Sequence, residues 1–133
     1  QHLGAWRAVL EADCRQRGLA FLVNPASLNE ADVVVALRER TGYAPSRWKS
    51  NVKLANAQAA GLPILCAREA GYVETASGAE CWVDSRADVT RWLDELAPEA
   101  RRIEIGEQMH EATPRIGDLT PLYAQWLRRF VRA

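Results

Sequence analysis

The stretch "DVVVAL" (32–37) is the clearest predicted strand of this chain and decides its fold class. Three consecutive valines favour a pleated backbone, and a continuous apolar run is typical of a strand buried on both faces of a parallel sheet. A second apolar run, "PILCA" (63–67), follows an alanine-rich segment that we expect to form a helix from about Ser50 to Ala60. This alternation of strand-like and helix-like apolar periodicity indicates an α/β protein.

The alternation continues on both sides of this unit. Upstream, Gly18 closes a predicted helix, and the run "LAFLV" (19–23) is typical of a short buried strand. Downstream, "ECWV" (80–83) is the fourth predicted strand, and Ser85 with Asp88 forms a capping box ahead of another helix. We therefore predict a Rossmann-like parallel sheet of about four strands, with helices on both faces.

A C-terminal helical pair is predicted after Pro98. Its first helix, 99–112, is weakly amphipathic, and its second carries a wide apolar stripe. The members of this stripe are Leu119, Leu122, Tyr123, Trp126, Leu127, Phe130 and Val131. Such a stripe is usually core; if it is an interface instead, Trp126 and Phe130 would be less buried than a core helix requires.

The composition indicates one globular domain. A chain of 133 residues has the size of a single domain, and 48% hydrophobic residues are enough to fill one core. We therefore predict a single Rossmann-like domain over 1–133. The 17 basic and 17 acidic residues balance, so the chain lacks the basic excess typical of duplex-binding surfaces, and nucleic acid is a disfavoured partner. No run approaches the roughly eighteen apolar residues of a membrane span.

The cysteines and histidines show no ligand pattern. Cys14, Cys66 and Cys81 lack metal-ligand spacing, and an odd number cannot all pair within one chain, so we interpret them as reduced thiols of a cytoplasmic protein. His110 is interpreted as solvated because no nucleophile lies at a readable spacing. We expect neither a metal nor a cofactor. The charged start lacks the apolar stretch of a signal peptide, and Gln1 in place of Met indicates a trimmed chain.

The start of the helix near Ser50 has the features of an anion site. In a doubly wound sheet, ligands lie at the carboxyl ends of strands, where the free amides of helix N-termini favour anions. Ser50 and Asn51 can cap the helix or donate to a phosphate, and Lys53 lies in the first turn, where a cation is unfavourable unless an anion is nearby. The alternative is a solvated lysine, which costs only about a few tenths of a kcal/mol.

The segment ahead of this helix is rich in cations. Arg38, Arg40, Arg47 and Lys49 lie between the predicted strand and the helix start. They could clamp an anion bidentately, or they could belong to an ordinary solvated loop.

The order of these segments resembles a known family. The run "SNVKLANAQAAGLPILC" (50–66), followed by "EAGYVET" (69–75) and "GAECWVDS" (78–85), is similar to the nucleotide-sugar-binding half of GT-B glycosyltransferases. That family has a serine- and lysine-bearing helix start, an alanine-rich helix, a G-x-P turn and a strand. A Gly-x-x-Glu segment and another short strand follow. The resemblance covers about 27–96.

The resemblance implies roles for individual residues. Lys53 and the amides near Ser50 would face the diphosphate of a nucleotide sugar or a nucleoside diphosphate. Gly71, Tyr72 and the backbone around them would line the sugar or base side. Glu74 matches the glutamate of the Gly-x-x-Glu segment.

The sequence departs from the family in two respects. Many retaining members place two glutamates eight positions apart, the second five residues before the glycine of the G-x-P turn. Trp48 and Asn56 occupy these positions here. Asn56 can hydrogen-bond a ribose hydroxyl and Trp48 can stack, but neither is a carboxylate, so no catalytic residue is predicted. The family also needs an acceptor-binding half, for which this chain has no room, so an acceptor domain or subunit would be a separate partner.

Two functions therefore remain open. In the first, the chain is the donor-binding half of a glycosyltransferase, and Lys53 stabilises the departing diphosphate. In the second, it is a non-catalytic module that binds a nucleotide, a phosphoester or a protein. Fold alone cannot choose between them.

Overall fold

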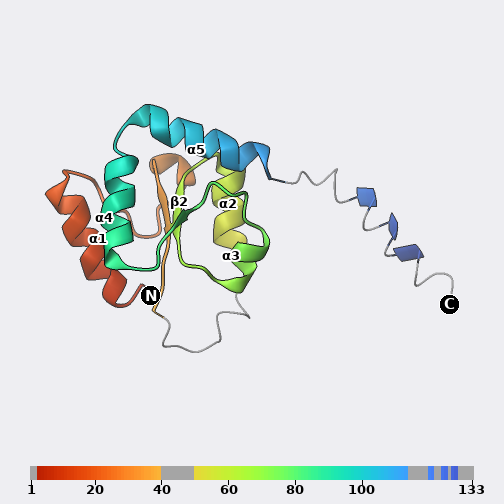
Figure 1. The fold of residues 1–133 in the computed structure, drawn as a ribbon, viewed down its shortest axis with the longest axis horizontal. Helices are drawn as coiled ribbons and strands as arrows, with labels where there is room; N and C mark the ends of the chain where they lie inside the picture. The colour runs from red at the N-terminus through yellow and green to blue at the C-terminus, as the bar shows by residue number, and fades with distance from the viewer. Residues whose placement is uncertain (1–2, 40–49, 114–119, 122–123, 126, 129–133) are drawn as a thin grey trace.

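A three-stranded parallel sheet lies between two sets of helices in the computed structural model of this chain (Figure 1). The structure describes residues 3–39, 50–113, 120–121, 124–125 and 127–128. Among them the sheet has the order β1-β2-β3, and its strands are β1 (Val34–Ala36), β2 (Ile64–Cys66) and β3 (Cys81–Trp82). The predicted mixed α/β class is therefore confirmed.

Helices precede, separate and follow the strands. Those described are α1 (Ala5–Gln16), the 3-10 turn η1 (Leu28–Glu30), α2 (Val52–Ala60), α3 (Ala70–Glu74), α4 (Arg86–Glu95) and α5 (Glu99–Glu111). Figure 1 shows α1 and α4 on one side of the sheet, α2 and α3 on the other, and α5 across one end of the strands. The sheet is thus covered on both faces, as the apolar run of each strand requires.

The centre of the core is β2. Ile64, Leu65 and Cys66 are each fully buried, because β1 and β3 flank the strand and helices cover both of its faces. Leu65 pairs with Val35 on one side and with Cys81 on the other, so the three strands are in register around it.

Local sequence explains where the helices begin and end. Gly61 adopts the left-handed conformation at the end of α2, with φ of 64°, and the Leu62 amide donates to the Ala57 carbonyl at 3.0 Å. This closure turns the chain into β2 through Pro63. At the start of α4, Ser85 and Asp88 form the predicted capping box.

Gly106 allows α5 to cross close to the end of α2. A Cβ atom on Gly106 would lie 1.9 Å from the carbonyl oxygen of Gly61. On the same helix, Ile105 and Met109 are buried, and Nδ1 of His110 lies 3.2 Å from the carbonyl oxygen of Gln58. Because Gly61 lies three residues ahead of Ile64, the first residue of β2, this contact places α5 at the amino end of the strand.

The predicted strand over 19–23 is wrong. These residues are not in the sheet, and the described sheet has three strands instead of about four. Leu19, Leu22 and Val23 are 46%, 46% and 45% exposed, so the apolar run is not buried as a core strand would be. A strand needs a neighbouring strand for its amides and carbonyls, and in the part of the chain that is described, no backbone hydrogen bond joins 20–23 to β1.

The C-terminal helical pair is seen in part. The first helix, predicted over 99–112, is α5. Most of the second lies outside the described residues, including Trp126 and Phe130, so the prediction about their burial stays a prediction. None of the helices described is long and apolar enough to cross a lipid bilayer.

We predict that Gly106→Ala lowers the free energy of unfolding. In an open helix this change would stabilise by about 0.5–1 kcal/mol. Here the new methyl group would collide with the Gly61 carbonyl, and overpacking of this kind costs about 1–3 kcal/mol. Urea denaturation measures the difference.

The matched control is Glu107→Ala, the neighbouring exposed position on α5, which we expect to remain within about 0.5 kcal/mol of the parent. A Gly106→Ala protein as stable as the parent would contradict the close crossing of α2 and α5.

Candidate anion-binding site

The carboxyl ends of the strands bring three chain segments together. Arg38 follows β1, and its guanidinium forms a two-pronged ion pair with the carboxylate of Glu69, which follows β2. Arg68 in turn lies 3.4 Å from the Asp84 carboxylate, beyond the end of β3. Side chains from neighbouring strand ends therefore meet at this edge, as expected for a parallel sheet.

The pair between Arg38 and Glu69 is the more buried of these two contacts. The Glu69 side chain is 6% exposed and that of Arg38 is 25% exposed. Nε and Nη2 of the guanidinium donate to the two carboxylate oxygens, so this edge of Arg38 is occupied. As a predicted anion clamp, Arg38 could offer only its remaining donors.

The predicted sugar side is formed around α3. The Tyr72 side chain is buried, whereas Glu74 is exposed and Gly71 partly so. Burial raises the pKa of the Tyr72 phenol, Glu69 raises it further, and Arg38 opposes the rise. The Tyr72 ring is therefore a neutral core group, and a ligand here would meet the backbone of α3 and the Glu74 carboxylate.

The start of α2 holds the predicted phosphate ligands. Ser50 and Lys53 are exposed, and Asn51 is the N-cap residue. The Asn51 side chain does not cap α2; its Nδ2 donates to Oγ1 of Thr75 at 3.0 Å. Among the described residues, Lys53 has no ion-pair partner. Asn56, the predicted ribose contact, is exposed one turn further along the helix.

A buried polar network supports this helix start, and sequence reasoning missed it. Nε2 of Gln58 donates to the Thr75 carbonyl at 2.9 Å and to Oε1 of Glu80 at 3.2 Å. Thr75 thus contacts Asn51 through its hydroxyl and Gln58 through its carbonyl. The sequence signal was the turn-forming pair Ser77 and Gly78, three and two residues ahead of Glu80, which directly precedes β3.

Glu80 is buried and ionised. Its Oε1 accepts from the amide and hydroxyl of Ser77, both at 2.7 Å, and its Oε2 accepts from the Gly78 amide at 2.9 Å. Burial alone would raise the pKa of Glu80, but these hydrogen bonds outweigh it, so the pKa lies below its ordinary value of 4.5.

A second carboxylate, Glu39, lies at the start of α1. Its Oε1 accepts from the Ala5 amide at 3.1 Å, where the helix dipole favours negative charge. Gly4 packs so closely on the Glu39 side chain that a Cβ atom there would overlap it. This helix start is therefore already occupied by a protein carboxylate.

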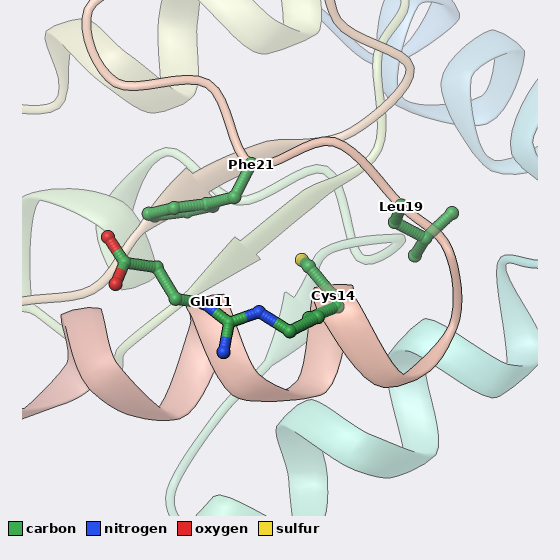
Figure 2. Close-up of a pocket in the computed structure, with 5 residues that line it drawn as sticks. Glu11, Cys14, Leu19 and Phe21 are labelled. Atoms are coloured by element: carbon green, nitrogen blue, oxygen red, sulfur yellow. The ribbon is translucent and has the colours of Figure 1, made fainter.

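A hollow of about 340 Å³ lies between α1 and the segment that follows it. Figure 2 shows the side chains that line it. It is lined by Glu11, Cys14, Arg15, Leu19 and Phe21. None of these residues is among the predicted site residues, and the Glu11 carboxylate would repel a diphosphate here. We therefore place the candidate site at the strand ends.

The thiols show no catalytic activation. Cys14, Cys66 and Cys81 are free and buried. Burial raises the pKa of all three, that of Cys81 to about 12, so they are protonated at neutral pH. In the described parts of the chain, no group of His, Cys, Asp and Glu side chains could hold a metal ion.

Four predicted residues, Arg40, Arg47, Trp48 and Lys49, lie outside the described residues, and their proposed contacts stay predictions. The described site thus joins Arg38, Glu69, α3 and the start of α2 at one edge of the sheet.

These features define the class of protein: a mixed α/β chain with a small open parallel sheet and charged side chains at the carboxyl ends of its strands. Comparisons of the chain with protein-family models, curated proteins and solved structures gave no match.

We predict that Glu80→Gln lowers stability at neutral pH and that the difference shrinks as the solution is acidified. A carboxylate with a depressed pKa stabilises the fold above pH 4.5, and this contribution is lost as the pH falls through the depressed value. Melting temperatures of parent and variant between about pH 7 and pH 3 measure the effect.

Glu74→Gln is the control, because it neutralises an exposed glutamate on α3 and should follow the parent curve. A constant difference between parent and Glu80→Gln at every pH would show that the network does not depend on the charge of Glu80.

Proposed function

We propose that the chain is a Rossmann-like nucleotide-sugar-binding domain of the GT-B glycosyltransferase type, which binds the donor through its diphosphate. The observation that carries the proposal is Lys53: an exposed cation in the first turn of α2, without an ion-pair partner among the described residues. A lysine there is unfavourable against the helix dipole unless an anion binds beside it.

The proposal is supported by the setting of Lys53. The helix is joined to a parallel β-α-β unit of the kind that binds phosphates at helix N-termini, and the Asn51 side chain is directed to Thr75 and does not cap the helix. The amides of the first turn therefore have no side-chain cap from Asn51 and can donate to phosphate oxygens. Glu74 and the α3 backbone would lie on the sugar side.

In the catalytic version of the proposal, a separate domain or subunit supplies the acceptor. Lys53 and the helix amides then stabilise the negative charge that develops on the departing diphosphate. The protein would act as a cytoplasmic glycosyl transferase.

One observation favours the alternative of a non-catalytic nucleotide- or phosphoester-binding module. Asn56, where retaining members of the family have a glutamate, is an exposed amide and cannot act as a carboxylate. The two versions share the diphosphate site and differ only in whether chemistry follows binding.

We predict that Lys53→Ala weakens the binding of nucleoside diphosphates by about 1.5–3 kcal/mol, the range for a charge-assisted hydrogen bond. The stability of the unliganded variant should stay within about 0.5 kcal/mol, because the side chain is exposed. Calorimetry measures the affinity. A ligand at one hundred times its dissociation constant should stabilise the parent by about 2.7 kcal/mol in a melting experiment.

Arg101→Ala is the control, since it removes the same charge from α5, on which no predicted site residue lies. If the parent binds no nucleoside diphosphate or nucleotide sugar, the proposed function is wrong. If Lys53→Ala binds as tightly as the parent, the phosphate does not lie at the start of α2.

A further inference from the structure

The segment that follows α1 has an apolar surface that faces solvent. Leu19, Leu22 and Val23 are each nearly half exposed, whereas Phe21 in the same run packs against the core. Leu19 and Phe21 also line the hollow beside Cys14 of α1 (Figure 2). We call the three exposed side chains and the hollow the α1-side patch. Large side chains exposed together in this way are typical of an interaction surface.

The C-terminal segment has a second uncovered apolar surface. Its described residues, 120–121, 124–125 and 127–128, are helical, and Figure 1 shows them apart from the body of the domain. Leu127, a member of the apolar stripe, is 54% exposed. A short isolated helix is marginal in water, so a helix with a wide apolar face needs an apolar surface to pack on.

The two surfaces lie in segments of opposite charge. Residues 19–33 contain no basic residue and two acidic ones, Glu30 and Asp32. Residues 119–133 contain no acidic residue and three basic ones, Arg128, Arg129 and Arg132. The Asp32 side chain is 85% exposed although Arg102 lies 4.0 Å from it, so a further cation can reach its carboxylate. Charge therefore favours contact between these segments.

The stripe and the patch belong to opposite faces of the sheet. Helix α5 ends beside α2, where His110 Nδ1 lies 3.2 Å from the Gln58 carbonyl oxygen, whereas the patch adjoins α1 on the other face (Figure 1). Leu119, the first member of the stripe, is six residues beyond Thr113, and six extended residues span at most about 20 Å. The stripe would have to pass around the sheet and its helices within that length to reach the patch of its own copy. The patch of a second copy can approach the exposed helix directly.

We propose that two copies of this chain form a two-fold dimer, in which the C-terminal apolar stripe of each copy packs on the α1-side patch of the other. The aromatic members of the stripe are the side chains that fit the hollow, because aromatic anchors in pockets dominate such interfaces. One patch is small against the roughly 800 Å² that each partner buries in a stable complex, and the two-fold arrangement makes the contact twice. The dimer does not depend on the proposed nucleotide site.

The test is sedimentation equilibrium of the full chain over a range of concentrations. The parent should show a monomer–dimer equilibrium. Leu22→Asp places a charge in the patch, and Leu127→Asp places one in the stripe. Each substitution is present at both contacts of a two-fold dimer, so each should raise the dimer dissociation constant by about a hundredfold or more.

Two controls carry the same new side chain outside the proposed contact. Ile103→Asp replaces an exposed apolar residue on α5, and Gln125→Asp replaces an exposed residue on the C-terminal helix that is not in the stripe. Both should dimerise as the parent does. Melting curves check that each variant is folded, and Val23→Asp replaces Leu22→Asp if the latter is not.

A mixture of the two disruptive variants tests which surface meets which. The Leu22→Asp copy keeps an intact stripe and the Leu127→Asp copy keeps an intact patch, so the mixture should form a dimer through one contact while each variant alone is monomeric. A parent that is monomeric at every concentration would overturn the proposal. So would a folded Leu22→Asp or Leu127→Asp protein that dimerises as tightly as the parent, or a mixture in which no dimer forms.

Discussion

The burial of β2 on both faces is the constraint on which the rest of this structure depends. Three successive residues without solvent exposure need a strand on each side and a helix layer on each face. The layers then determine where polar groups can lie. Side chains that follow Ala36 and Cys66 leave the core together at one edge, and this is why Arg38 and Glu69 meet although they are 31 residues apart.

Local signals made much of the fold predictable. The valine run, the Gly-x-Pro turn at Gly61 and the capping box at Ser85 each act within a few residues, and the structure has all three. The prediction of a strand over 19–23 was wrong because a strand depends on residues outside its own segment. Its apolar residues favour a strand, but a strand also needs a hydrogen-bonding neighbour, and that requirement cannot be read from the segment itself.

The candidate site was predictable only in outline. A helix start with a lysine after a predicted strand can be recognised in sequence, and the structure has Lys53 there. The partners of these groups could not be foreseen, since Asn51 contacts Thr75 and Gln58 contacts Glu80 across 24 and 22 residues. Asn51 illustrates the limit: propensity favours it as a cap, and a tertiary hydrogen bond overrides that preference.

The described cations at the strand ends differ in whether a carboxylate compensates their charge. Arg38 and Arg68 are each paired with a carboxylate, so each contributes directed donors and little net field. Lys53 has no such partner among the described residues, and it is the cation there whose charge an incoming anion would be the first to neutralise. A site built in this way would obtain its attraction for phosphate from Lys53 and the α2 amides.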